Sequence, residues 1–135
     1  MILDTSFLID LFDGHQEAFK KGLELSEAGV IQRVPSPVAM ELSYGAAFGS
    51  ANERRNVQNA LRMYPIVELD EQVARRAGTL LANADKDSGG ESGIGAVDSM
   101  VGAVADSYGE PVLTANVADF ERLGVGVETY RVEQP

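Results

Sequence analysis

The first twelve residues, MILDTSFLIDLF (1–12), carry the pattern that decides the fold. A short apolar run, MIL, ends at Asp4, and apolar residues then recur with helical rather than alternating spacing. This order predicts a brief buried strand that leads directly into a helix capped by Asp4, Thr5 or Ser6. Open parallel sheets bind ligands at the carboxyl ends of their strands, which is where Asp4 stands. Taken alone, however, an aspartate after a strand is more often a helix cap than a ligand.

The remaining sequence alternates in the same way between short apolar runs and helical periodicity. Brief connections and short, apolar strands are typical of an α/β domain whose parallel sheet is covered on both faces. We therefore expect a single domain over residues 1–135, with a three-layer α/β/α architecture and a mostly parallel sheet of about four to five short strands. Ser36 is the expected cap of a helix with Pro37 at its first position. After the first strand, the expected strands are 30–34, 66–69, 111–114 and 125–130, and the expected helices are 16–27, 38–48, 53–63, 71–84, 94–108 and 116–122.

The composition excludes several classes of protein. A length of 135 residues is sufficient for one hydrophobic core without disulfide or metal staples. The absence of cysteine removes disulfide frameworks, cysteine-type zinc sites and thiol nucleophiles. No apolar run is long enough to span a bilayer, and Asp4 falls too early for the apolar region of a secretory signal. We expect a cytoplasmic protein without a membrane partner.

The chain is strongly acidic, with 21 acidic against 11 basic residues and a formal net charge of −10. Such a surface should repel nucleic acid and attract cations or basic partners. The acidity has two possible sources, which are carboxylates gathered at a metal site or a surface adapted to a salt-rich cytoplasm, where screening suppresses self-repulsion. Because the acidic residues are spread along the whole chain, the composition favours the halophilic interpretation for most of them.

Two further carboxylates lie in apolar surroundings. Asp98 lies in AVDSMVGAVA (96–105) and Glu41 in PVAMELSYG (37–45), and neither has Lys or Arg three or four residues away. A buried carboxylate needs a partner or a metal ion. Asp98 could instead serve the N-terminal dipole of its helix, and Glu41 could be an ordinary exposed glutamate. Together with Asp4, the two carboxylates suggest a shared cation.

The donor types indicate which cation this would be. Oxygen ligands, with no cysteine and a single histidine, point to Mg²⁺ or Mn²⁺ rather than zinc. That histidine, His15, fits an exposed helix cap better than a ligand. The sequence contains neither a nucleophile elbow nor a glycine-rich phosphate loop with its lysine. These observations favour hydrolysis at phosphorus by metal-activated water.

Four segments resemble the PIN domain family in order and spacing, and together they span nearly the whole chain. They are ILDTS (2–6), PVAMELSYG (37–45), AVDSMVGAVA (96–105) and VLTANVADF (112–120). The length is similar to that of the VapC toxins of type II toxin–antitoxin systems. The resemblance implies a Mg²⁺- or Mn²⁺-dependent endoribonuclease that leaves a 5′-phosphate and a 3′-hydroxyl.

The resemblance also implies roles for individual residues. Asp4 and Asp98 match the principal metal ligands, and Glu41 matches a residue that ligates the metal or orients water. Asn116 stands where many members carry an acid, so Asp119 is the nearest carboxylate at that position and a second metal is in doubt. The catalytic set is then Asp4, Glu41, Asp98 and Asp119, with Thr5, Ser6 and Thr114 as hydrogen-bonding support. Asn116 is also a supporting residue, able to ligate only through its neutral carbonyl, and either Asn116 or Asp119 completes the site.

The partners implied are RNA, a VapB-like antitoxin laid across apolar grooves of the early helices, and a second copy of the chain. Arg54, Arg55 and Arg62, with Arg75 and Arg76, are the candidates for contacting phosphates, although a solvated face paired with nearby acids explains them as well. An inactive PIN-like binding or assembly module and an RNA-processing nuclease that is not a toxin remain alternatives. The intact set of carboxylates argues against the inactive module.

Overall fold

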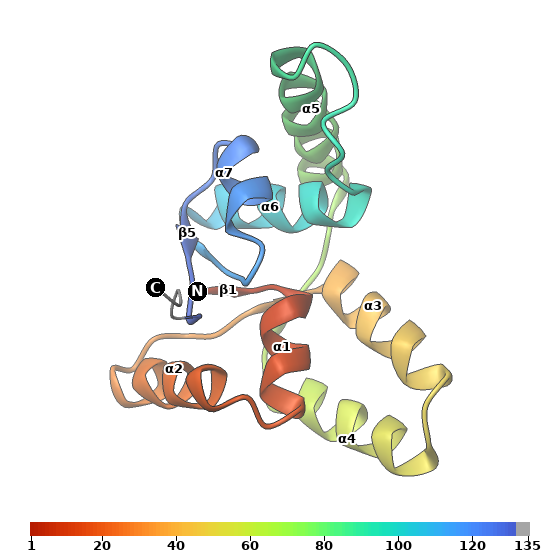
Figure 1. The fold of residues 1–135 in the computed structure, drawn as a ribbon, viewed down its shortest axis with the longest axis vertical. Coiled ribbons are helices and arrows are strands. Elements are labelled where there is room, and N and C mark those ends of the chain that lie inside the picture. The colour runs from red at the N-terminus through yellow and green to blue at the C-terminus, as the bar shows by residue number, and fades with distance from the viewer. Residues whose placement is uncertain (132–135) are drawn as a thin grey trace.

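The computed structural model describes residues 1–131, and each strand in this part of the chain is two residues long (Figure 1). The first four strands each lead into a helix, with at most three residues between the end of the strand and the start of the helix. The strands are β1 (Ile2–Leu3), β2 (Val34–Pro35), β3 (Ile66–Val67), β4 (Val112–Leu113) and β5 (Val127–Glu128). The helices are α1 (Thr5–Phe12), α2 (Gln16–Glu27), α3 (Ser36–Ala47), α4 (Ala51–Arg62), α5 (Glu71–Asp87), α6 (Ala96–Tyr108) and α7 (Val117–Arg122).

All strand pairs in the described residues are parallel. β1 pairs with β4 and β4 with β5, while β2 pairs with β3. A parallel bridge between Ile2 and Arg33 joins the two sheets, and the Leu3 amide donates to the Arg33 carbonyl at 2.9 Å. The spatial order is therefore β3-β2-β1-β4-β5, with β1 in the middle. The predicted α/β fold with a parallel sheet is confirmed, and the carboxyl ends of β1 and β4 lie side by side.

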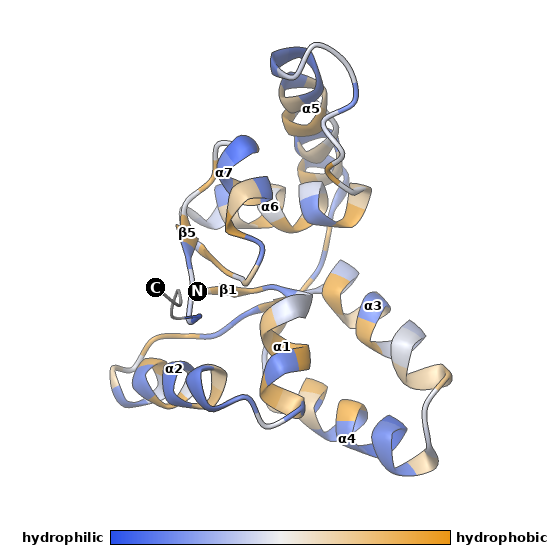
Figure 2. Ribbon diagram, viewed as in Figure 1, coloured by the Kyte–Doolittle hydropathy of each residue, from blue (hydrophilic) through white to orange (hydrophobic). Residues whose placement is uncertain are grey.

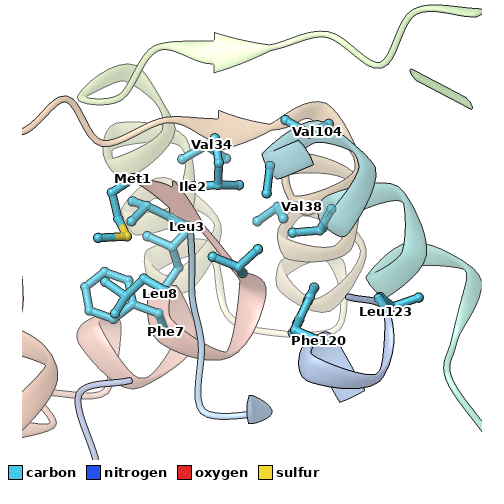
Figure 3. Packing of buried hydrophobic residues seen from close by; sticks show 14 of the residues in the cluster. Met1, Ile2, Leu3, Phe7, Leu8, Val34, Val38, Val104, Phe120 and Leu123 are labelled. Carbon is cyan, nitrogen blue, oxygen red and sulfur yellow. The ribbon is translucent and has the colours of Figure 1, made fainter. Parts of the chain in front are cut away.

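The core lies around the middle strands of this sheet. Both residues of β1 and β4 are fully buried, and so are Phe7 of α1 and Phe120 of α7 (Figure 3). Each such side chain contributes about 1.5–3 kcal/mol of burial free energy relative to exposure. Hydrophilic residues gather at the far ends of α4 and α5, away from this core (Figure 2). The ends of β1 and β4 are thus held in place by the packed hydrophobic core.

Small residues in α6 allow close packing against α7. Gly102 is buried, and a Cβ atom placed on it would lie 3.2 Å from Cδ1 of Leu123, which follows α7. A side chain at position 102 would crowd Leu123, which would have to shift to make room for it. The glycine therefore keeps the segment that contains Asn116 and Asp119 close to the helix that carries Asp98.

Several predicted boundaries were wrong. The strand predicted over 30–34 is displaced to Val34–Pro35, and the other strands are shorter than predicted because only two residues of each have paired neighbours. Ser36 is the first residue of α3, and Pro35 occupies the cap position. The Ser36 hydroxyl instead accepts a hydrogen bond from the Leu69 amide at 3.1 Å, which ties α3 to the chain beyond β3. Across residues 1–131, no helix combines the length and apolar character that crossing a bilayer requires.

Candidate active site

Asp4 occupies the cap position of α1 but does not act as its cap. Its side chain makes no capping hydrogen bond and is only 4% exposed. Oδ2 of Asp4 instead accepts hydrogen bonds from the hydroxyls of Ser6 at 2.9 Å and Thr114 at 2.7 Å. The carboxylate at the end of β1 is therefore directed toward the end of β4.

The two hydroxyls on Asp4 are themselves fixed by backbone amides. The Ala115 amide donates to Ser6 Oγ at 3.0 Å, and the Asn116 amide donates to Thr114 Oγ1 at 2.8 Å. Because each hydroxyl has one proton and directs it to Asp4, the carboxylate acts as the common acceptor of both. This network fixes the orientation of Asp4.

Glu41 reaches the same region from α3. Its side chain is half-buried, and its Oε1 accepts a hydrogen bond of 2.6 Å from the hydroxyl of Thr5, the first residue of α1. The alternative of an ordinary exposed glutamate is therefore wrong. The first two residues of α1 orient two different carboxylates, since Thr5 binds Glu41 and Ser6 binds Asp4.

Asp98 and Asp119 are bridged by the amide of Asn116. Asp98 lies in the first turn of α6, and its Oδ2 accepts from Asn116 Nδ2 at 3.1 Å. The same nitrogen donates to Oδ2 of Asp119 at 3.0 Å. Arg122 lies 3.8 Å from the other oxygen of Asp119, so this is the one carboxylate of the four with a cation beside it in residues 1–131. Asn116 holds together two acids that would otherwise repel each other.

The four carboxylates act on one another electrostatically. Burial raises the pKa of Asp98 to about 6, and the charges of Asp4, Glu41 and Asp119 contribute to this rise, while the hydrogen bond from Asn116 opposes it. Four acidic residues that are far apart in the sequence therefore come together at the carboxyl ends of β1 and β4. The excess of negative charge is the main electrostatic feature of this region, and a cation would relieve it.

The donor set fits a hard divalent cation, although it is not arranged as a finished cage. In the described part of the chain, no group of three Asp, Glu or His side chains already converges in the manner of a metal site. Asp4, Glu41 and Asp98 each have one carboxylate oxygen that no hydrogen bond occupies within residues 1–131, and solvent reaches these oxygens. Carboxylate oxygens are the ligands that Mg²⁺ and Mn²⁺ prefer.

The arginines divide into two groups. Arg54, Arg55 and Arg62, all exposed on α4, form no ion pair with the residues that the structure describes. Each of the other five has a carboxylate partner: Arg33 with Glu110, Arg75 with Glu71, Arg76 with Asp106, Arg122 with Asp119 and Arg131 with Asp10. The solvated-face interpretation therefore holds for Arg75 and Arg76, whereas the arginines of α4 have no such explanation.

One supporting contact has no signal in the sequence. Tyr130, beyond β5, donates a hydrogen bond of 2.6 Å to Asp10 of α1, and its ring packs edge-on against Phe7 at 5.1 Å. Burial and the Asp10 carboxylate raise the pKa of Tyr130. His15 caps α2 through its ring nitrogen, as expected. Tyr130 holds in place the helix whose first turn orients Asp4 and Glu41. It lies 120 residues from Asp10 in sequence, so local patterns could not reveal the contact.

Comparisons with known proteins agree with this geometry. The sequence matches the PIN domain over residues 1–126. It is 27% identical over 132 residues to a tRNA(fMet)-specific endonuclease VapC of Salmonella typhimurium, with 96% of each chain covered. A DNA-bound VapBC structure from Salmonella typhimurium has a TM-score of 0.82 at 23% identity, covering 96% of this chain and 97% of that one. A toxin–antitoxin complex from Klebsiella pneumoniae has a TM-score of 0.74 at 27% identity, with 96% and 97% covered.

Proposed function

The chain belongs to the PIN domain family, and from this premise we propose that it is a Mg²⁺- or Mn²⁺-dependent endoribonuclease and the toxin of a toxin–antitoxin pair. The family resemblance expected from the four sequence segments is confirmed. One observation carries the proposal for this chain: four carboxylates, from four separate segments, meet at the carboxyl ends of β1 and β4, where burial and the charges of the other three raise the pKa of Asp98 to about 6. Such a concentration of charge suits a divalent cation and a phosphodiester substrate.

Asp4 and Asp98 would hold the cation through their free oxygens. A bound divalent cation supplies an acidified water molecule and neutralises charge on the phosphoryl oxygens. Ser6 and Thr114 keep Asp4 in place, and Thr5 holds one oxygen of Glu41 while the other can orient water and accept its proton. The water oxygen adds to phosphorus as the bond to the 3′ oxygen breaks, and the leaving 3′ oxygen takes a proton from solvent, which gives a 5′-phosphate and a 3′-hydroxyl. Asn116 and Asp119 complete the site.

RNA must approach a chain whose formal net charge is −10. The arginines of α4 support such an approach because their charge is not used in ion pairs within residues 1–131. Arg54, Arg55 and Arg62 are therefore the proposed phosphate contacts, while Arg75 and Arg76 are committed to neighbouring acids.

An antitoxin is the proposed protein partner. The solved relatives from Salmonella and Klebsiella are complexes of a toxin with its antitoxin. In this chain, an open apolar groove of about 470 Å³ lies between α2 and the end of α4, and Phe19, Leu23 and Met63 are exposed along it. An amphipathic helix or tail of a VapB-like antitoxin would cover these side chains. We also propose that the chain forms homodimers.

The cellular setting is proposed on the basis of charge. The acidic residues that do not belong to the four-carboxylate group are dispersed, which supports a salt-rich cytoplasm where a short Debye length screens their repulsion. A nuclease that processes RNA without being a toxin would have the same active site. Expression of the chain with and without the product of a neighbouring antitoxin gene separates these roles, because growth arrest that the second product relieves is expected only of a toxin.

The test of the enzymatic proposal combines binding and cleavage. Protein freed of metal with EDTA should bind Mn²⁺ in titration calorimetry and cleave RNA only after Mn²⁺ or Mg²⁺ is restored. Asp4→Asn and Asp98→Asn should abolish both properties while the circular dichroism spectrum stays that of the wild type. Asp106→Asn, on the same helix as Asp98 but paired with Arg76, is the matched control and should retain both. Cleavage that persists in EDTA would refute the metal dependence.

A further inference from the structure

We infer that Tyr44 of α3 and Phe48, the residue that caps the end of α3, form a stacking surface for unpaired nucleotides next to the bond that is cut, with Arg54 as the phosphate contact at its far end. This inference rests on the proposed ribonuclease function and names how a single strand would be held at that site. We call the two aromatic residues the aromatic strip.

The aromatic strip is exposed to a degree that is unusual for its residue types. Tyr44 is 67% and Phe48 78% exposed, and their rings contact each other edge-on with centroids 5.1 Å apart. The opposite face of α3, with Val38, Leu42 and Ala46, is buried in the core. Stabilisation of the fold therefore does not account for the two aromatic side chains.

The aromatic strip begins at the proposed active site. Glu41 and Phe48 are seven residues apart, so they lie only about 20° apart around the helix and about 10 Å apart along it. Tyr44 lies between them, one turn beyond Glu41. A strand whose phosphate approaches Glu41 can thus continue along α3 with its bases beside the two rings. Aromatic side chains bind unpaired bases in this way without reading their sequence.

The charge at the far end of the aromatic strip fits the same ligand. Arg54 Nη1 donates a hydrogen bond of 2.8 Å to the carbonyl of Gly49, which follows Phe48, so its guanidinium is held beside the end of α3. It forms no ion pair with any residue from 1 to 131. An occupant must offer flat apolar groups to the rings and an anion to Arg54. An unpaired nucleotide combines a base and a phosphate, and in a protein of net charge −10 the stacking contact would add affinity that does not depend on electrostatic attraction.

A fluorescence experiment tests the stacking contact directly. The chain contains no tryptophan, so Tyr44→Trp introduces a unique probe. In EDTA, where the proposed cleavage is silent, a single-stranded oligouridylate should quench this fluorescence, and the same length of duplex RNA should not. Tyr108→Trp is the matched control because Tyr108 is also exposed and its ring lies beneath Arg33 rather than beside α4. The control should show no quenching.

Affinity measurements test how much the aromatic strip and Arg54 each contribute to RNA binding. Tyr44→Ala and Phe48→Ala should each weaken binding of the oligouridylate about 10-fold, with an unchanged slope of log Kd against log salt. Arg54→Gln should reduce that slope by about one, because it removes a phosphate contact. With Mn²⁺ restored, the two alanine variants should raise KM for a single-stranded substrate about 10-fold, with a smaller change in kcat.

The results that would overturn the stacking inference differ from those that would overturn the proposed ribonuclease function. Wild-type affinity in both alanine variants, or no RNA binding by the wild type, would overturn the inference. Conversion of a wild-type dimer to monomers by Tyr44→Ala, seen by sedimentation velocity with RNA affinity intact, would assign the strip to a second copy of the chain instead. Loss of antitoxin binding alone would assign it to that partner. Metal-dependent cleavage by variants with normal KM would leave the proposed function standing, whereas RNA binding without any cleavage would refute that function and not the stacking.

Discussion

Replacing Asp98 with asparagine should stabilise the metal-free protein while it destroys metal binding. Burial and three neighbouring carboxylates raise the pKa of Asp98 from 3.8 to about 6, so ionisation of this group is unfavourable in the folded chain. A rise in pKa of that size corresponds to about 3 kcal/mol of extra cost for ionising Asp98 in the folded chain. Because solvent reaches part of the carboxyl, we expect Asp98→Asn to increase the free energy of unfolding by about 1–2 kcal/mol at neutral pH. For a chain of this length, this gain corresponds to a rise in Tm of roughly 5 °C.

The pH dependence follows from the direction of the shift. Between about pH 4 and 6 the folded protein binds a proton at Asp98 that the unfolded chain has lost, so the stability contributed by this proton is present below pH 4 and is lost as the pH rises through 6. The Asp98→Asn variant lacks this titration and can still accept the hydrogen bond from Asn116. The difference in stability between variant and wild type should therefore grow from near zero at pH 4 to its full value above pH 6.

The assay is thermal unfolding followed by circular dichroism in EDTA, with wild type and variant compared at each pH so that other titrating groups cancel. Asp106→Asn serves as the control, because its partner Arg76 is exposed and the pair is worth little. Addition of Mn²⁺ should raise the Tm of the wild type above that of Asp98→Asn. A variant that is less stable than the wild type at pH 7.5 in EDTA, or a difference that does not change between pH 4 and 6, would refute the electrostatic account.

Three further predictions concern the surroundings of the site. Thr114→Val should cost about 1–3 kcal/mol in urea unfolding, because it removes one of the two hydroxyls that donate to Asp4 and leaves the Asn116 amide without a partner. An unchanged midpoint would contradict the network. Asn116→Asp should lower the Tm in EDTA, because it adds a further negative charge to the carboxylates. It should also tighten Mn²⁺ binding about 10-fold in calorimetry, because it adds a charged ligand. Weaker Mn²⁺ binding would show that residue 116 does not face the cation. Raising KCl from 0.1 to 2 M should increase the Tm, because screening shortens the Debye length from about 10 Å to below about 3 Å; a flat or falling Tm would contradict salt adaptation.

The junction between β1 and α1 could be predicted from sequence because two signals coincide there. The apolar run changes to helical spacing at Asp4, and the residues Asp4, Thr5 and Ser6 are all types that favour the start of a helix. Asp98 and Glu41 were identifiable for a different reason, since each is a charged residue in an apolar helix without a cation on its own face. Burial of a charge is expensive, so these positions conflict with the local pattern where function requires them.

Other features depend on tertiary contacts that no local pattern records. The strands are short because pairing partners are available for only two residues of each, and apolar residues alone do not reveal this limit. The Ser36 hydroxyl binds Leu69 instead of capping its own helix, which only the position of β3 explains. Phe19 and Leu23 of α2 have the composition of a core face and are nevertheless exposed, because nothing in residues 1–131 covers them.

The role of Asn116 shows most clearly what sequence alone could not supply. A family resemblance marks the position as one where an acid is common, but the bridge from its amide to Asp98 and Asp119 depends on the packing of α7 against Gly102 of α6. The pairing of Arg75 is different, because the sequence itself places Glu71 at i−4, whereas no acid lies three or four residues from Arg54. What the sequence could not show is that Arg54 donates to the backbone carbonyl of Gly49.

The most direct test of the central claim is cleavage of a defined single-stranded RNA by metal-free protein to which Mn²⁺ is returned in steps, with the ends of the products identified. We predict no cleavage in EDTA, cleavage that rises with Mn²⁺ to saturation, products with 5′-phosphate and 3′-hydroxyl ends, and no cleavage by folded Asp4→Asn at any Mn²⁺ concentration. Cleavage by Asp4→Asn at the wild-type rate, or cyclic phosphate ends formed without metal, would contradict this prediction.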